Sequence, residues 1–415
     1  MITQQQIRLT KLALALSVAL AASPSFAQNT TSAVGGRISN VSGQPAAGAQ
    51  VQILHTESGS VSNVVTDAEG RYVARGLRVG GPYTITITKD GITQTRNNVF
   101  LDLAQTAEVD ATLGVQTVTI AGTASRSEVF SNNNMGAGTA ISNTQLQTQA
   151  SIQRNLQDYA RADPRVSQTD KDRGEISVAG QNSRYNSTTI DGVAINDTFG
   201  LEANGSPTAR QPISIEAIQS VQVNVANYDV TQKGYTGANI NAVTKSGTNT
   251  YKGGVYYVYR NDNLSGDRYN PITDVYTDAP KSKETTKGVW ASGPLIQDKL
   301  FIYALAENFE SSRSSPEFGA IGSGAGTTVG ISQSSIAEAQ RIAQQTYGVD
   351  IGSTAVPSGS MLTSKERLVK FDWNITDEHR ANLRYAKTEQ GEPFYPGFSA
   401  TGVGLSSSFY NQGKS

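Results

Sequence analysis

The sequence predicts a multidomain, mostly β protein: an N-terminal β-sandwich, a central α+β domain and the start of a transmembrane antiparallel β-barrel, which is incomplete. Three observations predict this fold class. Short β-prone segments separated by turn signals fill residues 34–113. A helical pattern followed by glycine-containing β-prone blocks fills residues 134–247. In residues 251–415, segments of roughly 10 residues alternate between apolar and polar side chains, as transmembrane β-strands do.

The composition excludes several classes of protein. The formal net charge of the 415 residues is −1, so no overall basic field would attract nucleic acid. Cysteine is absent and His55 and His379 are the only histidines, which leaves neither a disulfide framework nor a His/Cys metal cluster. We therefore expect no metal, no cofactor and no enzymatic activity. No apolar run reaches the roughly 20 residues of a transmembrane helix.

Residues 1–27 have the pattern of a signal peptide. Arg8 and Lys11 form a positive region, and an apolar run follows in residues 12–22. Ser25-Phe26-Ala27 offers a cleavage site of small residues, which predicts cleavage before Gln28. The apolar run is too short to cross a hydrocarbon core of about 30 Å. The protein is therefore expected to be exported.

Residues 34–113 are predicted to form the sandwich. Period-two alternation in residues 49–54 and a β-branched run in residues 82–88 indicate short strands. The turn that runs from Thr66 to Gly70 and leads into Tyr72 resembles a recurring pattern of the carboxypeptidase regulatory-like domain, which implies a non-catalytic module. Asp67 and Glu69 could form a calcium pair, but an Asp that opens a turn bonds its own backbone, so turn residues explain them better.

The linker, residues 114–133, contains a short β-prone segment. Such a segment can stay extended and offer its backbone edge to a partner strand, which is β-augmentation. It resembles the TonB box, which implies TonB, part of the inner-membrane energy-coupling complex, as a partner. Gln116 stands where the family usually has an acid, and the last strand of a sandwich would look similar. The predicted box residues are Gln116, Thr117, Val118, Thr119 and Ile120.

Residues 134–247 begin with a helical pattern and continue with β-prone blocks. Ser142 is expected to cap a helix that continues to about Tyr159, with Ile152 and Leu156 on the same face. The blocks that follow are Glu175–Gln181, Thr188–Val193, Ile215–Val223 and Gly234–Gly247. In order, these four blocks resemble the plug domain of TonB-dependent receptors. Ala179 departs from the Arg of many relatives, and residues 225–229 replace an Arg-Gly-Pro turn, in the style of the Oar-like subgroup.

Residues 251–415 are predicted to form the first strands and loops of the barrel. Residues 288–295 and 300–307 indicate one hairpin, and residues 369–375 and 380–385 a clearer one. In the second hairpin charged side chains occupy the face opposite the apolar one, which favours a wet lumen. Residues 310–365 are expected to be a long extracellular loop with a short helix in residues 334–347.

The length of this last region sets a limit on the barrel. Barrels that hold a plug have about 22 strands, whereas residues 251–415 leave room for about five or six strands with their loops. An open sheet with lipid-facing edges is not viable in a membrane. The sequence is therefore expected to be an N-terminal fragment or early-terminated part of a longer transporter.

The resemblance implies TonB-dependent outer-membrane transport of an unidentified solute. The solute would bind outside, and TonB energy coupling would open the plug. The expected location is the cell outer membrane, in contact with its lipid, with the sandwich and the plug on the periplasmic side. Arg184, Tyr185, Asn196 and Asp197 are candidate ligand-facing residues of plug loops, although the solubility of exposed loops explains them about as well.

Two other classes stay open at this point. An outer-membrane adhesin or assembly protein could use the sandwich to bind a glycan or a protein partner. A signalling transducer would need a βαβ-type N-terminal domain, and the sandwich pattern argues against it.

Overall fold

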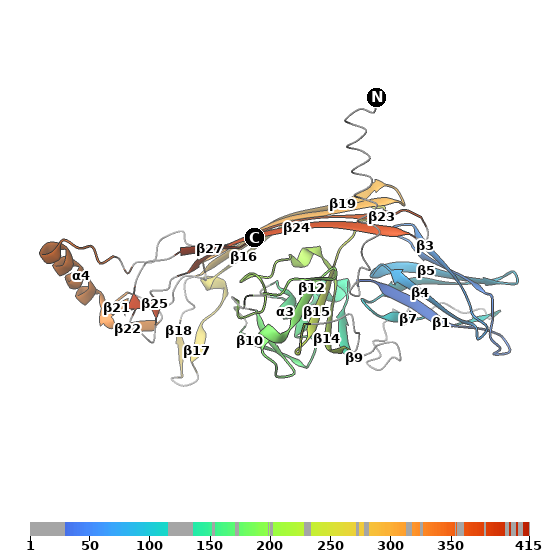
Figure 1. The fold of residues 1–415 in the computed structure, drawn as a ribbon, viewed down its shortest axis with the longest axis horizontal. Helices are drawn as coiled ribbons and strands as arrows, with labels where there is room; N and C mark the ends of the chain where they lie inside the picture. Colours follow the sequence, from blue (N-terminus) through green and yellow to red (C-terminus); the bar gives the residue numbers. More distant parts are fainter. Residues whose placement is uncertain are drawn as a thin grey trace, which may run out of the picture.

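The computed structural model contains three parts arranged in a row (Figure 1). The residues that the structure describes are 30–114, 136–151, 154–170, 174–197, 199, 202–227, 234–270, 274–277, 282–312, 318–323, 327–352, 354, 361–376, 379–394, 398–399, 404–405 and 410–414. A sandwich lies at one end, a central domain lies beneath a long sheet, and loops lie at the other end. The predicted fold class is confirmed. The predicted signal peptide and the TonB-box-like segment lie outside the described residues.

The sandwich packs two four-stranded sheets face to face. One sheet contains β4 (Arg71–Leu77), β1 (Ser32–Asn40), β7 (Thr106–Glu108) and β8 (Ala111–Leu113), and the other has the order β3 (Ser60–Val65), β2 (Gln50–His55), β5 (Gly80–Lys89), β6 (Ile92–Leu101). Alternate side chains such as Ile53, Ile85 and Ile87 fill the core between them. The Asp67 carboxylate accepts the N–H groups of Glu69 and Arg71 at 3.0 and 2.7 Å, which is the turn role predicted for it.

The central domain surrounds a five-stranded sheet. The strand order is β13 (Val193–Ala194), β12 (Ser187–Ile190), β15 (Asn239–Thr244), β14 (Ile218–Asn227), β9 (Gly136–Ile141). β12 and β15 are parallel, and β14 is antiparallel to both of its neighbours. The smaller elements are α2 (Asn143–Thr148), α3 (Leu156–Ala160), the hairpin β10 (Val166–Asp170) and β11 (Glu175–Val178), and the 3-10 turns η1 (Ser183–Tyr185) and η2 (Ile215–Ala217).

The prediction of a single helix from Ser142 to about Tyr159 is wrong, because the structure has two short helices there. Its start is correct, because Ser142 and Gln145 form a capping box at α2. The helix stops at Gln149, whose backbone is extended, and Asn155 caps α3 by accepting the N–H of Asp158 at 2.8 Å. This second N-cap, Asn155, lies in the middle of the helical pattern and offers the backbone an alternative to a continuous helix.

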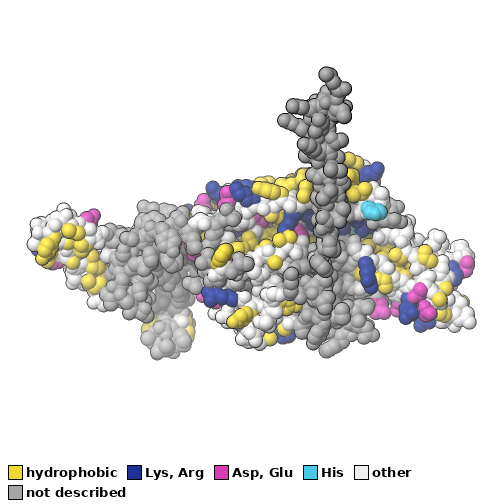
Figure 2. Space-filling model, in the orientation of Figure 1, with side chains coloured by type: hydrophobic (Ala, Val, Ile, Leu, Met, Phe, Trp, Pro, Cys, Tyr) yellow, Lys and Arg dark blue, Asp and Glu magenta, His cyan; other side chains and the backbone are white. Residues whose placement is uncertain are grey.

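The long sheet, which we call the wall sheet, is an antiparallel meander of six strands. Its order is β16 (Lys252–Asn261), β19 (Lys283–Ile296), β20 (Leu300–Ser311), β23 (Leu362–Asn374), β24 (Arg380–Phe394), β27 (Tyr410–Lys414). Side chains on one face, such as Val255, Leu383 and Tyr385, are exposed, and Figure 2 shows apolar side chains along this sheet. The sheet is open, with β16 and β27 at its edges.

The opposite face of the wall sheet covers the central domain. Lys370 and Asp372, whose charges favour a wet lumen, are buried on this face, and so is Glu366. The central domain lies against this face (Figure 1), and Lys370 and Asp372 also line a cavity between the parts of the chain. These buried charges are therefore in contact with protein groups and with the cavity.

The connections of the wall sheet differ between its two ends. Residues 297–299 form a short turn at the end where the sandwich lies. At the same end the N–H groups of Ile375 and Thr376 donate to the His379 carbonyl at 3.0 and 3.1 Å, which brings the end of β23 close to the start of β24. At the other end lie η3 (Asp262–Leu264), β17 (Arg268–Asn270), β18 (Val275–Thr277), β21 (Phe318–Ile321), β22 (Thr327–Ser332), α4 (Gln333–Ile342), the π-helical turn η4 (Ala343–Tyr347), β25 (Phe398–Ser399) and β26 (Gly404–Leu405). The helix expected in residues 334–347 is confirmed. Within the described part of the chain, no helix combines the length and apolar character needed to span a bilayer.

A glycine at the exit of the central domain gives a test of its fit against the wall sheet. A Cβ on Gly247 would lie 2.5 Å from the Ile302 carbonyl oxygen and 2.9 Å from that of Gly293. We expect Gly247→Ala to destabilise the packing of the central domain against the wall sheet by about 1–3 kcal/mol of free energy. Fluorescence of Trp290 during urea titration measures this in a Trp373→Phe background, because these are the only tryptophans. Gly330→Ala, whose Cβ would meet nothing within 4 Å, should leave the midpoint unchanged.

Candidate functional site

Two of the sequence blocks meet at one tight turn of the central domain. Asp191 and Gly192 connect β12 to β13 with φ values of 47° and 79°, a conformation that favours Asp and Gly. The Asp191 carboxylate accepts the backbone N–H of Thr244 at 2.8 Å and its hydroxyl at 2.6 Å. The Nε of Arg384, on β24 of the wall sheet, lies 3.4 Å from the same carboxylate. The turn therefore joins two blocks of the central domain to the wall.

A second connection is centred on a buried carboxylate of the wall sheet. Glu307 of β20 is 4% exposed and accepts the hydroxyls of Ser214 and Tyr256, each at 2.6 Å. Arg210 of the central domain donates to its other oxygen at 3.2 Å and stacks over Phe309, 3.9 Å from the ring centroid. Charge-assisted hydrogen bonds of this kind compensate a buried charge for the loss of water.

A further ion pair lies beside this carboxylate. Arg154 and Glu216, both in the central domain, are 2.7 Å apart, and Arg154 also lies over the Tyr256 ring at 5.7 Å. Tyr256 therefore contacts both Glu307 and Arg154. The charged side chains of the central domain therefore lie next to the buried carboxylate of the wall sheet and form one cluster with it.

Apolar contacts also hold the central domain against the wall sheet. We call this whole interface, polar and apolar, the seat. A single hydrophobic cluster contains core residues of the central domain together with Tyr303, Leu305 and Leu368 of the wall sheet. Hydrogen bonds also run from Lys370 to the Thr244 carbonyl at 3.1 Å and from Thr388 to the Pro212 carbonyl at 3.0 Å. The central domain and the wall sheet therefore share a core.

The structure places the four candidate ligand-facing residues at one end of the central domain. β12 starts at Ser187, just after Tyr185, and ends beside Thr244, which is close to the sandwich end of the wall. Arg184, Tyr185, Asn196 and Asp197 therefore lie at the end away from the sandwich, which we call the apex. Arg184 is exposed and Tyr185 is 56% exposed.

The two polar residues of this set shape the loops. Asn196 accepts the Thr188 N–H at 3.1 Å and donates to the Asn186 carbonyl at 2.6 Å. The Asp197 carboxylate accepts the N–H groups of Phe199 and Glu202 at 3.0 and 2.7 Å. Ligand contact by these residues stays a prediction.

One apex residue was missed by sequence reasoning. Phe199 is 85% exposed, and its backbone N–H donates to the Asp197 carboxylate. A large aromatic side chain in a polar loop was the available signal, because such exposure is characteristic of binding surfaces.

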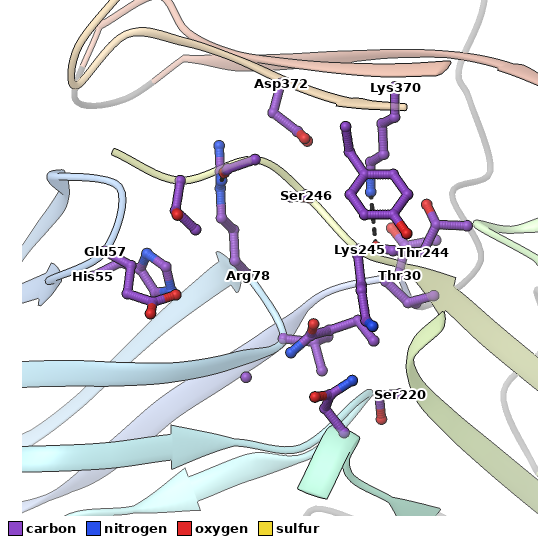
Figure 3. A pocket seen from close by; sticks show the side chains of 18 of the residues that line it. Thr30, His55, Glu57, Arg78, Ser220, Thr244, Lys245, Ser246, Lys370 and Asp372 are labelled. Atoms are coloured by element: carbon purple, nitrogen blue, oxygen red, sulfur yellow. Dashed lines mark hydrogen bonds between the residues drawn. The ribbon is translucent and has the colours of Figure 1, made fainter. Parts of the chain in front are cut away.

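A cavity of about 600 Å³ lies at the other end, where three parts of the chain meet. Figure 3 shows His55, Glu57 and Arg78 from the sandwich, Ser220, Thr244, Lys245 and Ser246 from the central domain, and Lys370 and Asp372 from the wall sheet. Lys245 lies over the Trp290 ring at 5.5 Å, and burial lowers its pKa. Among the described residues, no group of three or more His, Cys, Asp or Glu could hold a metal ion.

Three family models together match most of the chain. Residues 33–114 match the carboxypeptidase regulatory-like domain, residues 132–243 the TonB-dependent receptor plug domain, and residues 243–414 an outer membrane beta barrel domain. The chain belongs to the TonB-dependent receptors. It is one with an N-terminal carboxypeptidase regulatory-like domain, and it is located in the outer membrane.

The receptor is similar to the TonB-dependent transporter Oar of Myxococcus xanthus, with 28% identity over 298 residues. The match covers 68% of this chain and 27% of that relative, so the chain spans about a quarter of the relative's length. Among solved structures, the siderophore receptor PirA from Acinetobacter baumannii is 20% identical, with a TM-score of 0.42 over 63% of this chain and 32% of that one. The outer membrane transporter YddB from Escherichia coli is 13% identical, with a TM-score of 0.44 over 62% and 33%.

These family matches are to a receptor and a transporter rather than to an enzyme. In the terms of the family, the central domain is the plug and the wall sheet belongs to the barrel. The predicted TonB-box residues, 116–120, fall between the regulatory-like domain and the plug and lie outside the described residues.

The buried carboxylate gives the second test. Glu307→Ala leaves Arg210 buried without its partner, and we expect the plug to be released at a lower urea concentration, with a loss of about 3–5 kcal/mol. Trp290 fluorescence in the Trp373→Phe background is the measurement. Glu310→Ala removes an exposed carboxylate from the same strand and is the matched control. Equal midpoints for the two variants would show that Glu307 does not hold the plug.

The third test concerns His55. Burial, and then the charges of Arg78, Arg380 and Lys252, lower its pKa from 6.5 to about 3. Its neutral form is therefore favoured by folding, and the stability that it contributes is complete above pH 6.5 and is lost as the pH falls from 6.5 toward 3. NMR titration of the ring proton in a His379→Asn variant, where His55 is the sole histidine, should give a midpoint near 3. A midpoint near 6.5 would contradict the buried, neutral state.

Proposed function

We propose that this receptor takes up a solute across the outer membrane, with the plug as the gate and TonB as the source of energy. The observation that carries the proposal is the seat of the plug on the inner face of the wall sheet. The two parts share a hydrophobic cluster and a buried carboxylate bound by Arg210 and Ser214. A domain held in this way closes the space beside the wall until it moves.

The polar part of the seat is suited to a gate. Glu307, Arg210, Asp191 and Arg384 are charged, so water can solvate each of them once the plug is displaced. Opening therefore exchanges protein hydrogen bonds for hydrogen bonds to water, which is nearly neutral for many of them. The shared apolar cluster opposes opening, and an external force must supply the difference.

The apex is the proposed site of first contact with the solute. Arg184 supplies a guanidinium, and Tyr185 and Phe199 supply exposed aromatic rings in neighbouring loops. Asn196 and Asp197 contribute indirectly, because their hydrogen bonds fix the loops that carry these side chains. A fixed loop loses less conformational entropy when a ligand binds.

TonB is proposed to bind residues 116–120 by β-augmentation. In this mode backbone hydrogen bonds supply affinity, and alternate side chains such as Thr117 and Thr119 supply selectivity. A proline within the segment removes a backbone donor and restricts the residue before it.

The fourth test is therefore a proline substitution. Val118→Pro should weaken binding of the purified periplasmic domain of TonB to the full receptor by about tenfold or more, measured by surface plasmon resonance. Val129→Pro places the same change in the linker outside the predicted box and should leave the affinity unchanged. Weakening by Val129→Pro alone would place the box elsewhere. Equal binding by all three proteins would remove residues 114–133 as the TonB site.

A further inference from the structure

The sandwich has a hydrophobic core of its own. Its buried cluster contains residues of the sandwich alone, whereas the cluster of the plug includes Tyr303, Leu305 and Leu368 of the wall sheet. The described contacts that hold the sandwich to the rest of the receptor are mainly polar or charged. Interfaces of this kind between domains permit relative motion unless they are large and hydrophobic.

One group of contacts involves the turn between β2 and β3. The Glu57 carboxylate lies 2.8 Å from the Lys252 ammonium on β16, and the Glu57 carbonyl accepts the Asn249 N–H at 2.7 Å. The Asn249 side chain in turn donates to the Asp298 carboxylate at 2.7 Å in the first short turn of the wall sheet. This turn of the sandwich is therefore connected to the segment where the plug becomes barrel.

The other group of contacts is made by two arginines. Arg380, at the start of β24, donates to the Val61 and Gly76 carbonyls of the sandwich at 3.0 and 3.3 Å. Arg78 of the sandwich donates to the Gly247 carbonyl at 3.3 Å and lies over the Phe301 ring at 5.2 Å. We call the interactions of Glu57, Arg78 and Arg380 the latch.

The space behind the latch is not filled by apolar packing. The cavity of about 600 Å³ lies between the three parts, and Arg78 and Arg380 both line it. Asp372 lines it too and is buried. Charged side chains of the sandwich and of the wall sheet therefore face the same cavity.

The docked sandwich also fixes where the linker begins. Thr30 and Thr31 line the cavity, and β1 runs from there away from the barrel (Figure 1). β8 is parallel to the far half of β1, so Gly114 lies at the far end of the sandwich. Because the nine residues of β1 span roughly 30 Å, the linker begins about that far from the cavity. The predicted TonB box starts two residues after this point.

From these contacts we infer that the sandwich is a detachable cap, docked by the latch across the periplasmic end of the plug and released when the latch opens. Docked, it holds the start of the linker away from the barrel and covers the exit of the plug. Undocked, it leaves this exit and the linker free. The inference that the sandwich can dock and undock rests on the latch contacts alone. The inference that undocking serves energy coupling rests on the proposed transport function.

Distances between spin labels test the docking. The chain has no cysteine, so labels at Val65→Cys in the sandwich and Ile296→Cys beside the first short turn, both exposed positions, report one distance in the full receptor. We expect a narrow distribution at about 0.1 M salt and a broader one at about 1 M, where charge interactions are screened. Arg380→Glu should raise the undocked fraction roughly tenfold or more, because it removes the charge-assisted hydrogen bonds that Arg380 donates to the sandwich.

Three further variants separate docking from damage to the fold. Glu57→Lys should broaden the distribution, and adding Lys252→Glu should narrow it again, because the pair is restored with its charges exchanged. Arg75→Glu reverses an exposed charge of the same sandwich, at a side chain with no described contact to the barrel, and should leave the distribution narrow. A narrow distribution in every variant and at both salt concentrations would overturn the proposal. So would a broad one in the unmodified receptor at low salt.

Hydrogen exchange gives a second, independent measurement. The Asn249 amide donates to the Glu57 carbonyl only in the docked state. Its exchange should therefore become faster, roughly in proportion to the undocked fraction, in Arg380→Glu and not in Arg75→Glu. Neither measurement depends on transport, so failure of the cap and failure of the proposed function give different results. Unchanged exchange in Arg380→Glu would count against the latch even if uptake were confirmed.

Discussion

The carboxylate of Glu307 determines how the plug fits against the wall sheet. It lies in the middle of a wall strand and is 4% exposed, so its charge must be satisfied by protein. Tyr256, also of the wall, supplies one donor, but Ser214 and Arg210 come from the plug. The wall sheet is therefore electrostatically incomplete without the plug, and Arg210 would be equally unsatisfied without the wall.

A buried ion pair of this kind contributes more to position than to stability. Replacing both partners by apolar groups of similar volume is often neutral or stabilising, whereas removing one is strongly destabilising. The apolar part of the seat, with Tyr303 and Leu305, could be formed in several nearby positions. Arg210, which lies over Phe309, and the two donors that the plug supplies to Glu307 define one position among them. Polar contacts thus specify where the plug rests, and apolar contacts supply most of the resistance to its release.

The sequence was sufficient for the order of the parts but not for the contacts between them. The Asp-Gly turn and the Val-Thr-Lys-Ser-Gly block are recognisable in the sequence, yet only the fold places Asp191 against Thr244. Glu307 follows a run of mostly apolar residues, and its partner Arg210 is 97 positions away, so no local pattern connects them. The helix after Ser142 is interrupted for a related reason, because its interruption depends on neighbours that local periodicity does not reveal.

The two interfaces of the receptor differ in strength, and under the proposed function this difference sets an order of events. Only residues 114–115 separate the box from β8, whereas residues 121–135 separate it from β9. A pull on the box is therefore transmitted at once to the sandwich, and reaches the plug only when the longer segment becomes taut. The sandwich is held by the polar latch, and the plug by a shared apolar core. The weaker interface is loaded first, so release of the cap precedes movement of the plug. Because water can solvate the latch residues after release, the step requires little force. The remaining pull acts on β9, which pairs with β14 and is an edge strand of the plug sheet among the described residues.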